Sequence, residues 1–181
     1  MTEQLQFRPV LDHMDLVGAP VAAGLRALPP DVAAGVRVAV IDPDLADTAA
    51  FCAAYGFAPE ASANCVVVAG RREGVERHAA CVVLATTRAD VNNVVRRHLD
   101  VRKISFAKLD EAVALTGMEY GGITAVGLPD SWPVLVDGAV LGAGDVLMGS
   151  GVRGSKLLMP ASVLTALPTS EVLTGMATPV G

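Results

Sequence analysis

The strand-like runs of this sequence come in closely spaced pairs, and this spacing most limits how the chain can fold. The runs Cys65–Ala69 and Ala79–Ala85 are rich in valine and other apolar residues, and the charged segment Arg71–Arg77 around Gly74 lies between them. Two such runs joined by a glycine-containing turn are typical of a β-hairpin. Further strands are expected over residues 36–41, 104–106, 133–137, 145–148 and 156–159. The pattern predicts an α/β or α+β fold with a mixed or mainly antiparallel sheet.

Two helices are predicted from their capping residues. Asp47 is a good N-cap for a helix over residues 48–55, and Gly56 follows where a left-handed C-terminal residue is favoured. Residues 108–116 also have a helical pattern, and Gly117 comes directly after it. Asp47 therefore predicts the start of the first helix, and Gly56 and Gly117 predict where the two helices stop.

Three further helices and a frayed tail are also predicted. Residues 87–90 fit a variant capping box and predict a helix that runs to about Leu99. A short helix is expected over residues 22–28, and another over residues 160–167 with Pro160 in its first turn. The tail after Pro168 is expected to be frayed.

Composition and charge exclude several classes of protein. The chain has 181 residues, of which 52% are hydrophobic and 18% charged, so we expect one folded domain with a sizeable core. It has no apolar run of the ~18 residues needed to span a bilayer, and its first residues do not resemble a secretory signal. We therefore expect a cytoplasmic protein without a membrane partner. The net charge of −5 argues against a broad DNA- or RNA-binding surface, but a pocket that holds one end of an RNA remains open.

Cysteine and histidine give no sign of a metal site or a disulfide framework. Cys52, Cys65 and Cys81 are odd in number and widely spaced in apolar surroundings, so we expect small buried core residues. The three histidines lack the spacing of metal ligands. No metal and no cofactor are expected.

Two glycine-rich segments are candidates for a binding site. Thr116–Pro129 reads TGMEYGGITAVGLP, a pattern that fits either a tight connection or a loop that lines a pocket with main-chain groups. Gly149–Lys156 reads GSGVRGSK and nearly matches a phosphate-binding Walker loop, but the lysine comes one residue late and a strand pattern follows. A nucleotide triphosphatase is therefore disfavoured, while a nest of main-chain N–H groups stays possible at this turn.

In their order along the chain, these pieces resemble the YbaK and prolyl-tRNA-synthetase-associated domain family of aminoacyl-tRNA deacylases. The resemblance covers about residues 36–167. It rests on the helix at 47–56, the strand at 63–68, the segments 81–93 and 116–117, the loop at 121–124, the segment 133–141 and the turn at 149–151. On this reading residues 1–35 are an N-terminal extension packed on the domain, and residues 168–181 are a C-terminal tail.

The resemblance implies both a fold and an activity. The family fold is a single compact domain around a curved, largely antiparallel sheet, and its members remove wrong amino acids from tRNA without a metal. Alanine or cysteine attached to the tRNA for proline is an example. The glycine loop contacts the aminoacyl group and the terminal ribose through its backbone, and a lysine at the start of the central strand matters in many members. The ribose hydroxyl or the side chain of the substrate can assist the reaction.

The sequence departs from the family pattern at two positions. Asn64 stands where the lysine is expected, and Asn donates hydrogen bonds but carries no charge. Ala125 stands where the loop pattern has proline, which leaves φ free at that position. Lys156 or Arg153, next to the second glycine turn, is a candidate source of the missing charge, although both residues also fit an ordinary solvated turn.

Three functions remain open from the sequence. The first is a free-standing deacylase that hydrolyses the ester of a mischarged tRNA, with the tRNA for proline as a candidate. Its partner would be the aminoacyl-tRNA acceptor end, and a synthetase is a second candidate. The second is a non-catalytic module that binds an aminoacyl or nucleotide-like group. The third is a structural partner of a synthetase or another oligomer. The expected substrate-binding residues are Asn64, Gly121, Gly122, Ile123, Thr124, Gly149, Ser150, Gly151 and Lys156, with the catalytic group unassigned.

Overall fold

The computed structural model describes residues 5–180, which form two main β-sheets and a small third one. The first sheet has the order β1-β2-β9-β8, the second has the order β10-β7-β4-β3-β6, and β11 pairs with β5. The strands are β1 Arg8–Pro9, β2 Arg37–Val40, β3 Ala63–Arg72, β4 Val75–Leu84, β5 Thr87–Ala89, β6 Lys103–Phe106, β7 Val134–Asp137, β8 Asp145–Gly149, β9 Ser155–Pro160, β10 Ser170–Leu173 and β11 Ala177–Pro179. Strand pairs are antiparallel except β4–β7 and β7–β10, so the predicted mixed, mainly antiparallel architecture is confirmed.

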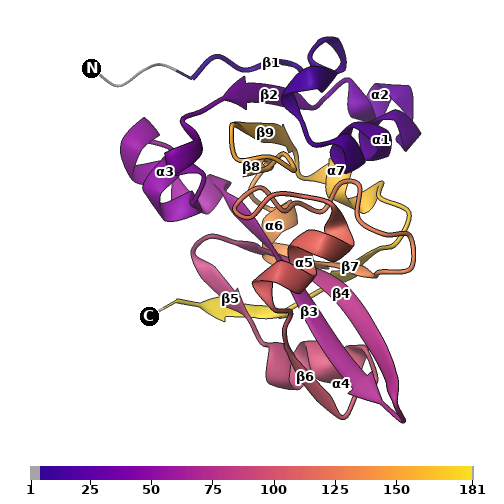
Figure 1. The fold of residues 1–181 in the computed structure, drawn as a ribbon. Coiled ribbons are helices and arrows are strands. Elements are labelled where there is room, and N and C mark those ends of the chain that lie inside the picture. The colour runs from indigo at the N-terminus through magenta and orange to yellow at the C-terminus, as the bar shows by residue number, and fades with distance from the viewer. Residues whose placement is uncertain (1–4, 181) are drawn as a thin grey trace.

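Short helices connect and cover the sheets. They are α1 Ala19–Ala27, α2 Pro30–Ala33, α3 Thr48–Tyr55, α4 Arg96–His98, α5 Leu109–Thr116, α6 Gly138–Leu141 and α7 Ser162–Thr165, with a π-helical turn Val91–Val95 directly before α4. Figure 1 places α1, α2 and the first sheet at one end of the molecule; the far end of the β3–β4 hairpin lies with β6 and α4 at the other. Among residues 5–180, the structure contains no helix with the length and apolarity to cross a membrane.

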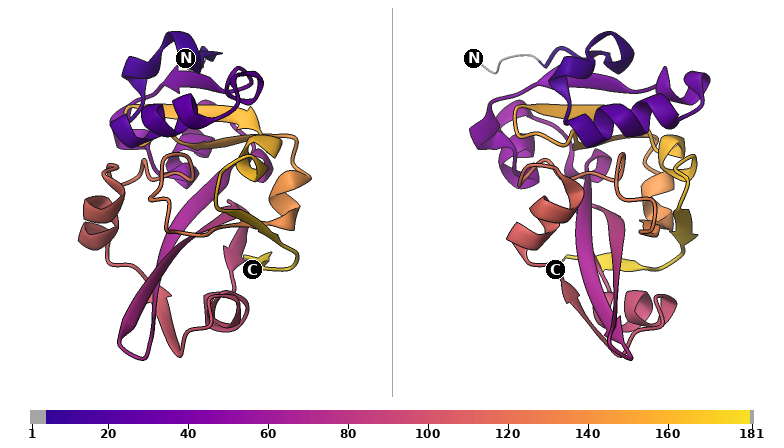
Figure 2. Two further views of the ribbon diagram at one scale, coloured as in Figure 1. Left: turned by 90° about the vertical axis from the view of Figure 1, so that its right-hand side faces the viewer. Right: turned by 45° about the vertical axis from the view of Figure 1, so that its right-hand side comes forward.

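The main core lies between the two large sheets and the N-terminal helices. Val21 and Leu25 of α1 are fully buried against apolar residues of β8 and β9, and Val82 of β4 belongs to the same cluster. The segment before β2 thus contributes core side chains to the domain. A second cluster under the far part of the hairpin joins Val68 to Val95 and to Met176 near the C-terminus. Figure 2 shows from two further sides how the hairpin links the two regions.

The two helices with predicted caps form as expected. The Asp47 carboxylate accepts hydrogen bonds from the main-chain N–H groups of Ala49 and Ala50, at 3.0 and 3.3 Å, and Gly56 ends α3 with φ +66°. Gly117 ends α5 in the same left-handed conformation. The hairpin around Gly74, which has φ +79°, is also confirmed.

The helix predicted to start from Thr87 begins three residues later. Residues 87–89 form β5, which pairs with β11, and the Thr87 hydroxyl donates to the Leu84 carbonyl. The residue that caps the helical turn is Asp90, whose carboxylate accepts from the Asn93 N–H at 3.0 Å. The capping-box interpretation was wrong because the backbone around Thr87 pairs with β11 and so cannot begin a helix.

The predictions for the C-terminal region were wrong in two places. Pro160 is the last residue of β9, opposite Asp145, and α7 begins only at Ser162. The tail is ordered: β10 pairs in parallel with β7, and Met176 between β10 and β11 is fully buried. Burial of one such side chain contributes about 1.5–3 kcal/mol, which, with the strand pairing, opposes fraying.

Candidate functional site

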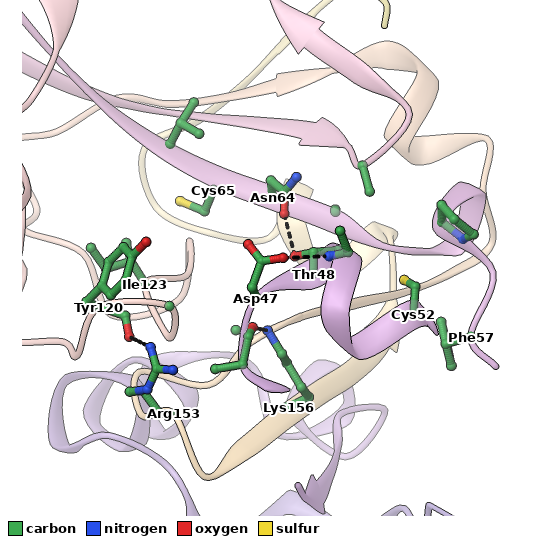
Figure 3. Close-up of a pocket in the computed structure, with 18 of the residues that line it drawn as sticks. Asp47, Thr48, Cys52, Phe57, Asn64, Cys65, Tyr120, Ile123, Arg153 and Lys156 are labelled. Atoms are coloured by element: carbon green, nitrogen blue, oxygen red, sulfur yellow. Dashed lines mark hydrogen bonds between the residues drawn. The ribbon is translucent and has the colours of Figure 1, made fainter. Parts of the chain in front are cut away.

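A pocket of about 930 Å³ opens where four segments distant in the sequence meet. These segments are the amino end of α3, the start of β3, the loop between α5 and β7, and the turn that joins β8 to β9. Figure 3 shows side chains from all four pointing toward the same space. The pocket lies between the two main sheets, as expected for a site built by connecting loops on a packed scaffold.

One wall is formed by the amino end of α3 and the start of β3. The Thr48 hydroxyl donates to the side-chain carbonyl of Asn64 at 2.7 Å, so this oxygen already has a partner. Oδ1 of Asp47 caps α3, as described above, and Asp47 also lines the pocket. Figure 3 shows Asp47, Thr48 and Asn64 side by side. This wall therefore offers a carboxylate oxygen, Oδ2, and the amide nitrogen of Asn64.

The opposite wall is built from the two glycine-rich segments, which pack backbone against backbone. The Gly151 N–H donates to the Gly122 carbonyl at 2.7 Å. A Cβ on Gly122 would lie 2.6 Å from the Val152 carbonyl oxygen, and a Cβ on Gly149 would lie 2.5 Å from the Gly122 oxygen. Such distances exclude any side chain at Gly122 and Gly149 unless the two segments move apart. The glycine pattern thus reflects the close approach of two loops.

Several main-chain N–H groups of this wall have no hydrogen-bond acceptor among the described residues, and those of Gly121 and Ile123 are among them. The N–H groups of Gly122 and Thr124 are used, by the Glu119 carbonyl at 2.9 Å and by the Met118 sulfur at 3.4 Å. Those of Gly121 and Ile123 have no such partner within residues 5–180, and both residues line the pocket. Unpaired main-chain N–H groups at a pocket wall are well suited to bind a carbonyl oxygen or an anion.

Lys156 is the buried cation of the pocket. Its side chain comes from β9, the residue is 3% exposed, and Nζ donates to the Ala46 carbonyl at 2.6 Å. The nitrogen lies 5.9 Å from the centre of the Phe51 ring. Burial lowers the pKa of the Lys156 ammonium; Asp47 and Cys52 oppose this shift and Arg153 adds to it.

Arg153 and Tyr120 form a second polar group that lines the pocket. The Arg153 guanidinium donates to the main-chain carbonyls of Pro43, at 2.8 Å, and Tyr120, at 3.1 Å. Its carbon lies 5.8 Å from the centre of the Tyr120 ring, and Tyr120 is 59% exposed. The Arg153 main-chain N–H also donates to the Glu119 carboxylate at 2.7 Å. The arginine is therefore held in place beside an accessible aromatic ring.

Cys65, one of the two cysteines that line the pocket, is a poor nucleophile. Burial, with a smaller contribution from Cys81, raises the pKa of the Cys65 thiol far above its usual range. Burial also raises the pKa of Cys81 to about 12. Because the thiolate is the reactive form, both groups are protonated and unreactive near neutral pH.

The structure divides the residues predicted for the site into two sets. Asn64, Gly121, Ile123, Gly149 and Lys156 line the pocket. The other four are Gly122, Thr124, Ser150 and Gly151, which lie behind the wall.

Buried hydroxyls explain part of that second set. The Ser150 hydroxyl donates to the main-chain carbonyl of Ser155 at 2.9 Å, so its role is to hold the β8–β9 turn. The Thr124 hydroxyl is buried without a hydrogen-bond partner among the described residues. Ala125 is 2% exposed and belongs to the main core, so it packs behind the loop and does not line the pocket.

Three pocket residues had no predicted role in the site. Asp47 was recognised only as a helix cap, and Thr48 and Tyr120 were not singled out at all. Asp47 and Thr48 lie outside both glycine-rich segments, whereas Tyr120 lies within the first of them, directly before Gly121. For Asp47, the available signal was a helix start placed directly after a strand and a turn.

A separate cluster of Glu76, His78 and Glu111 has the composition of a metal site. His78 Nε2 lies 3.3 Å from a Glu111 oxygen and 3.5 Å from a Glu76 oxygen. All three residues lie outside the set that lines the pocket. Stacking of His78 on Trp132 and the ion pair between Arg71 and Glu76 account for the arrangement without an ion.

Comparisons with known proteins agree on the fold. A family model for the aminoacyl-tRNA editing domain matches residues 42–166. The chain is also similar to a candidate trans-editing enzyme for prolyl-tRNA synthetase, with 20% identity, a TM-score of 0.70, and coverage of 86% of this chain and 93% of that one. The hypothetical protein APE2540 is similar at 20% identity and a TM-score of 0.69, over 79% of this chain and 91% of that one. No curated protein matches the chain in sequence.

Proposed function

Because the chain belongs to the aminoacyl-tRNA editing domain family, we propose that it hydrolyses the ester bond between a wrongly attached amino acid and the terminal ribose of a tRNA. The fold shared with a candidate trans-editing enzyme for prolyl-tRNA synthetase makes the tRNA for proline the first substrate to test. The amino acid would enter the pocket, whose inner surface includes the small side chains of Cys52, Ala53 and Ala63.

The observation that carries this proposal is the pair of unpaired N–H groups on Gly121 and Ile123. Attack of water on the ester converts the carbonyl oxygen to an oxyanion, and groups already aimed at that oxygen stabilise the transition state. Removal of one such donor typically slows an enzyme about 10²–10³-fold. The close packing of Gly122 against Val152 keeps the two donors in place before the substrate binds.

The wall at α3 suits the α-amino end of the substrate. A free aminoacyl ester carries a positive ammonium group, and the Asp47 carboxylate keeps one oxygen for it while the other caps the helix. An N-acetylated aminoacyl-tRNA has no such charge and would be a poorer substrate. Equal rates on the free and acetylated esters would show that Asp47 does not bind the ammonium.

Tyr120 and Arg153 suit the terminal nucleoside. Stacking of a base on an exposed aromatic side chain contributes about 1–3 kcal/mol, and a guanidinium beside the ring can pair with a phosphate. Both residues line the same pocket as the proposed oxyanion donors. The ester would therefore reach Gly121 and Ile123 while its base rests on Tyr120.

A second candidate function is a binding module without catalysis. The observation in its favour is Asn64, which is neutral and whose carbonyl oxygen is already held by Thr48. On this alternative the pocket would hold an aminoacyl or nucleotide-like group and leave the ester intact. Turnover gained only by Asn64→Lys would support it.

The test is a panel of mischarged tRNAs. Alanyl- and cysteinyl-tRNA for proline, with correctly charged prolyl-tRNA as the control, are incubated with the native protein, and loss of the labelled ester is followed. We expect hydrolysis of at least one mischarged species well above the rate in buffer, with the correct species spared. A native protein that hydrolyses none of a wider panel would rule the enzyme out.

Ile123 offers a matched pair for the proposed oxyanion donors. Ile123→Pro removes the main-chain N–H, whereas Ile123→Ala shortens the side chain and keeps it. We expect the proline variant to lose turnover far beyond the alanine variant when both are compared as folded proteins. Equal activity in the two would exclude this N–H from catalysis.

A further inference from the structure

We infer that Lys156 is a catalytic cation of the pocket, and that its ammonium contacts the oxyanion formed during hydrolysis of the ester. This inference rests on the function proposed above. It assigns to a β-strand residue the positive charge that the wall at α3 lacks, because Asn64 is neutral. The following observations support it.

Lys156 lies in a strand where an apolar residue would be expected. β9 is buried along most of its length, and Lys156 shares one face of the strand with Leu158. An ammonium at 3% exposure is costly to keep charged, since burial removes its hydration. A residue needed only for packing at this position would be apolar.

The charge of Lys156 is poorly compensated in the protein. Its one hydrogen bond goes to the neutral carbonyl of Ala46, and the ion pairs within residues 5–180 do not include it. Lysine has three N–H donors, so two remain after that bond. The Asp47 carboxylate favours the charged form of Lys156 and so raises its pKa, but the two groups are farther apart than the 4.0 Å of an ion pair. A buried cation with spare donors at a pocket wall is arranged to receive an anion from outside.

Arg153, the other cation of the pocket, already has hydrogen-bond acceptors within the protein. Arg153 is half-buried and donates to the Pro43 and Tyr120 carbonyls. Lys156 is the deeper of the two by exposure, and it lies over Phe51 on the same side as Asp47. It is therefore the better placed cation for charge that develops inside the pocket.

Hydrolysis of the ester needs water and no other reactant. The oxygen of a water molecule bonds to the carbonyl carbon, and the π electrons of the C=O bond move to the carbonyl oxygen, which becomes negative. As this oxyanion collapses, the bond from the carbonyl carbon to the ribose oxygen breaks. The protons of the attacking water end on the ribose oxygen and in solvent. Lys156 remains an ammonium throughout and gives no proton away.

The direction of the pKa shift predicts a pH dependence. Lys156 acts in its charged form, which is present below its pKa and is lost as the pH rises through it. Burial lowers that pKa, against Asp47 and Cys52 and together with Arg153, so activity should fall at a lower alkaline pH than for an exposed lysine. Replacement of Lys156 by a residue that does not titrate should remove this limb of the profile.

The experiment compares Lys156→Met, Lys156→Arg and, as the control, Lys103→Met, which removes an exposed lysine of β6. Single-turnover rates are measured on the mischarged tRNA that the native protein hydrolyses best, between pH 6 and 10. We expect Lys156→Met to lower the rate constant about 10²–10³-fold with little change in KM, and to lose the alkaline limb. Lys156→Arg should keep part of the rate, and Lys103→Met should match the native protein.

Stability separates a catalytic role from a structural one. Removal of a buried, uncompensated charge should leave the urea midpoint of Lys156→Met equal to or above the native value. A native rate and pH profile in Lys156→Met would overturn the inference alone. A loss of rate that follows a lowered midpoint would show Lys156 to be structural. Failure of the native protein to hydrolyse any ester would remove the proposed function and this inference together.

Discussion

The contact between the two glycine segments can be tested by adding one methyl group to it. In Gly122→Ala, the new Cβ would lie 2.6 Å from the Val152 carbonyl oxygen and 2.7 Å from the Val152 main-chain nitrogen and carbonyl carbon. Ordinary contacts of a Cβ begin at 3.4 Å, so the segments must separate by about 0.8 Å. Gly122 does not have the positive φ of Gly121, so the effect measures the collision and not backbone strain.

The expected loss of stability follows from two contributions. Overpacking of this kind costs about 1–3 kcal/mol. The hydrogen bond from the Gly151 N–H to the Gly122 carbonyl, 2.7 Å long, would stretch, and its loss costs about 0.5–1.5 kcal/mol. Together they lower the free energy of unfolding by about 1.5–4.5 kcal/mol, which in a chain of this size corresponds to a Tm lower by on the order of 10 °C.

Urea denaturation and thermal unfolding measure this loss, with Gly142→Ala as the control. A Cβ on Gly142 would meet the Ala139 carbonyl oxygen at 3.5 Å, an ordinary contact, and its φ of −78° suits alanine. We expect the control to stay within about 0.5 kcal/mol of the native protein. The same small effect in Gly122→Ala would refute the backbone-to-backbone packing described here. Ester hydrolysis by Gly122→Ala should also fall, because Gly121 and Ile123 move with the loop.

Three further predictions concern single pocket and core residues. Tyr120→Ala should raise KM for a CCA-ended substrate roughly 10-fold or more while Tyr120→Phe keeps the native value; an unchanged KM in the alanine variant would exclude stacking. Thr124→Val should leave the urea midpoint equal or higher, because its buried hydroxyl has no partner among the described residues; a loss above about 1 kcal/mol would reveal a missed acceptor. The Cys65 thiol should react with iodoacetamide at pH 8 far more slowly than free cysteine, because burial raises its pKa and keeps it protonated; rapid labelling, read by mass spectrometry, would contradict that environment.

Local signals predicted those elements whose stability is local. The N-cap Asp47, the left-handed Gly56 and the hairpin turn at Gly74 each act within a few residues, so the sequence around them is enough to place them. The order of strand-like runs also predicted a mixed, mainly antiparallel sheet. Capping and turn residues reach only as far as the backbone groups that they satisfy, and these predictions need nothing more distant.

The errors occur where a distant strand supplies the hydrogen bonds. Residues 170–173 look like a loose tail, but they pair with β7 in register from Ser170 opposite Val134 to Leu173 opposite Asp137. In the same way β11 pairs with the backbone around Thr87, and the helical turn is therefore capped by Asp90. Local propensity cannot include a partner strand that lies many residues away, so these segments were assigned to the wrong state.

The candidate site was predicted in part for the same physical reason. Glycines mark close approach whatever the partner, so both glycine segments were found although their contact was not. The sequence also allowed Lys156 to belong to a solvated turn, because a charged residue beside glycines usually does. Only the register of β9 shows that its side chain is buried and directed into the pocket. Asp47 had a sufficient local role as a cap, which concealed its second position at the pocket wall.

The charge of the chain then indicates how such a pocket would recognise a tRNA. With a net charge of −5, the protein has no general attraction for a polyanion, and the cations that line the pocket are Arg153 and Lys156. Affinity for single-stranded nucleic acid falls with salt in proportion to the phosphates neutralised, with a slope near −0.7 per phosphate. Contacts confined to these two residues give a shallow dependence on salt and little steering over distance. Recognition would therefore depend on short-range fit of the terminal nucleoside and its amino acid, which is what an enzyme that inspects the acylated end of a tRNA requires.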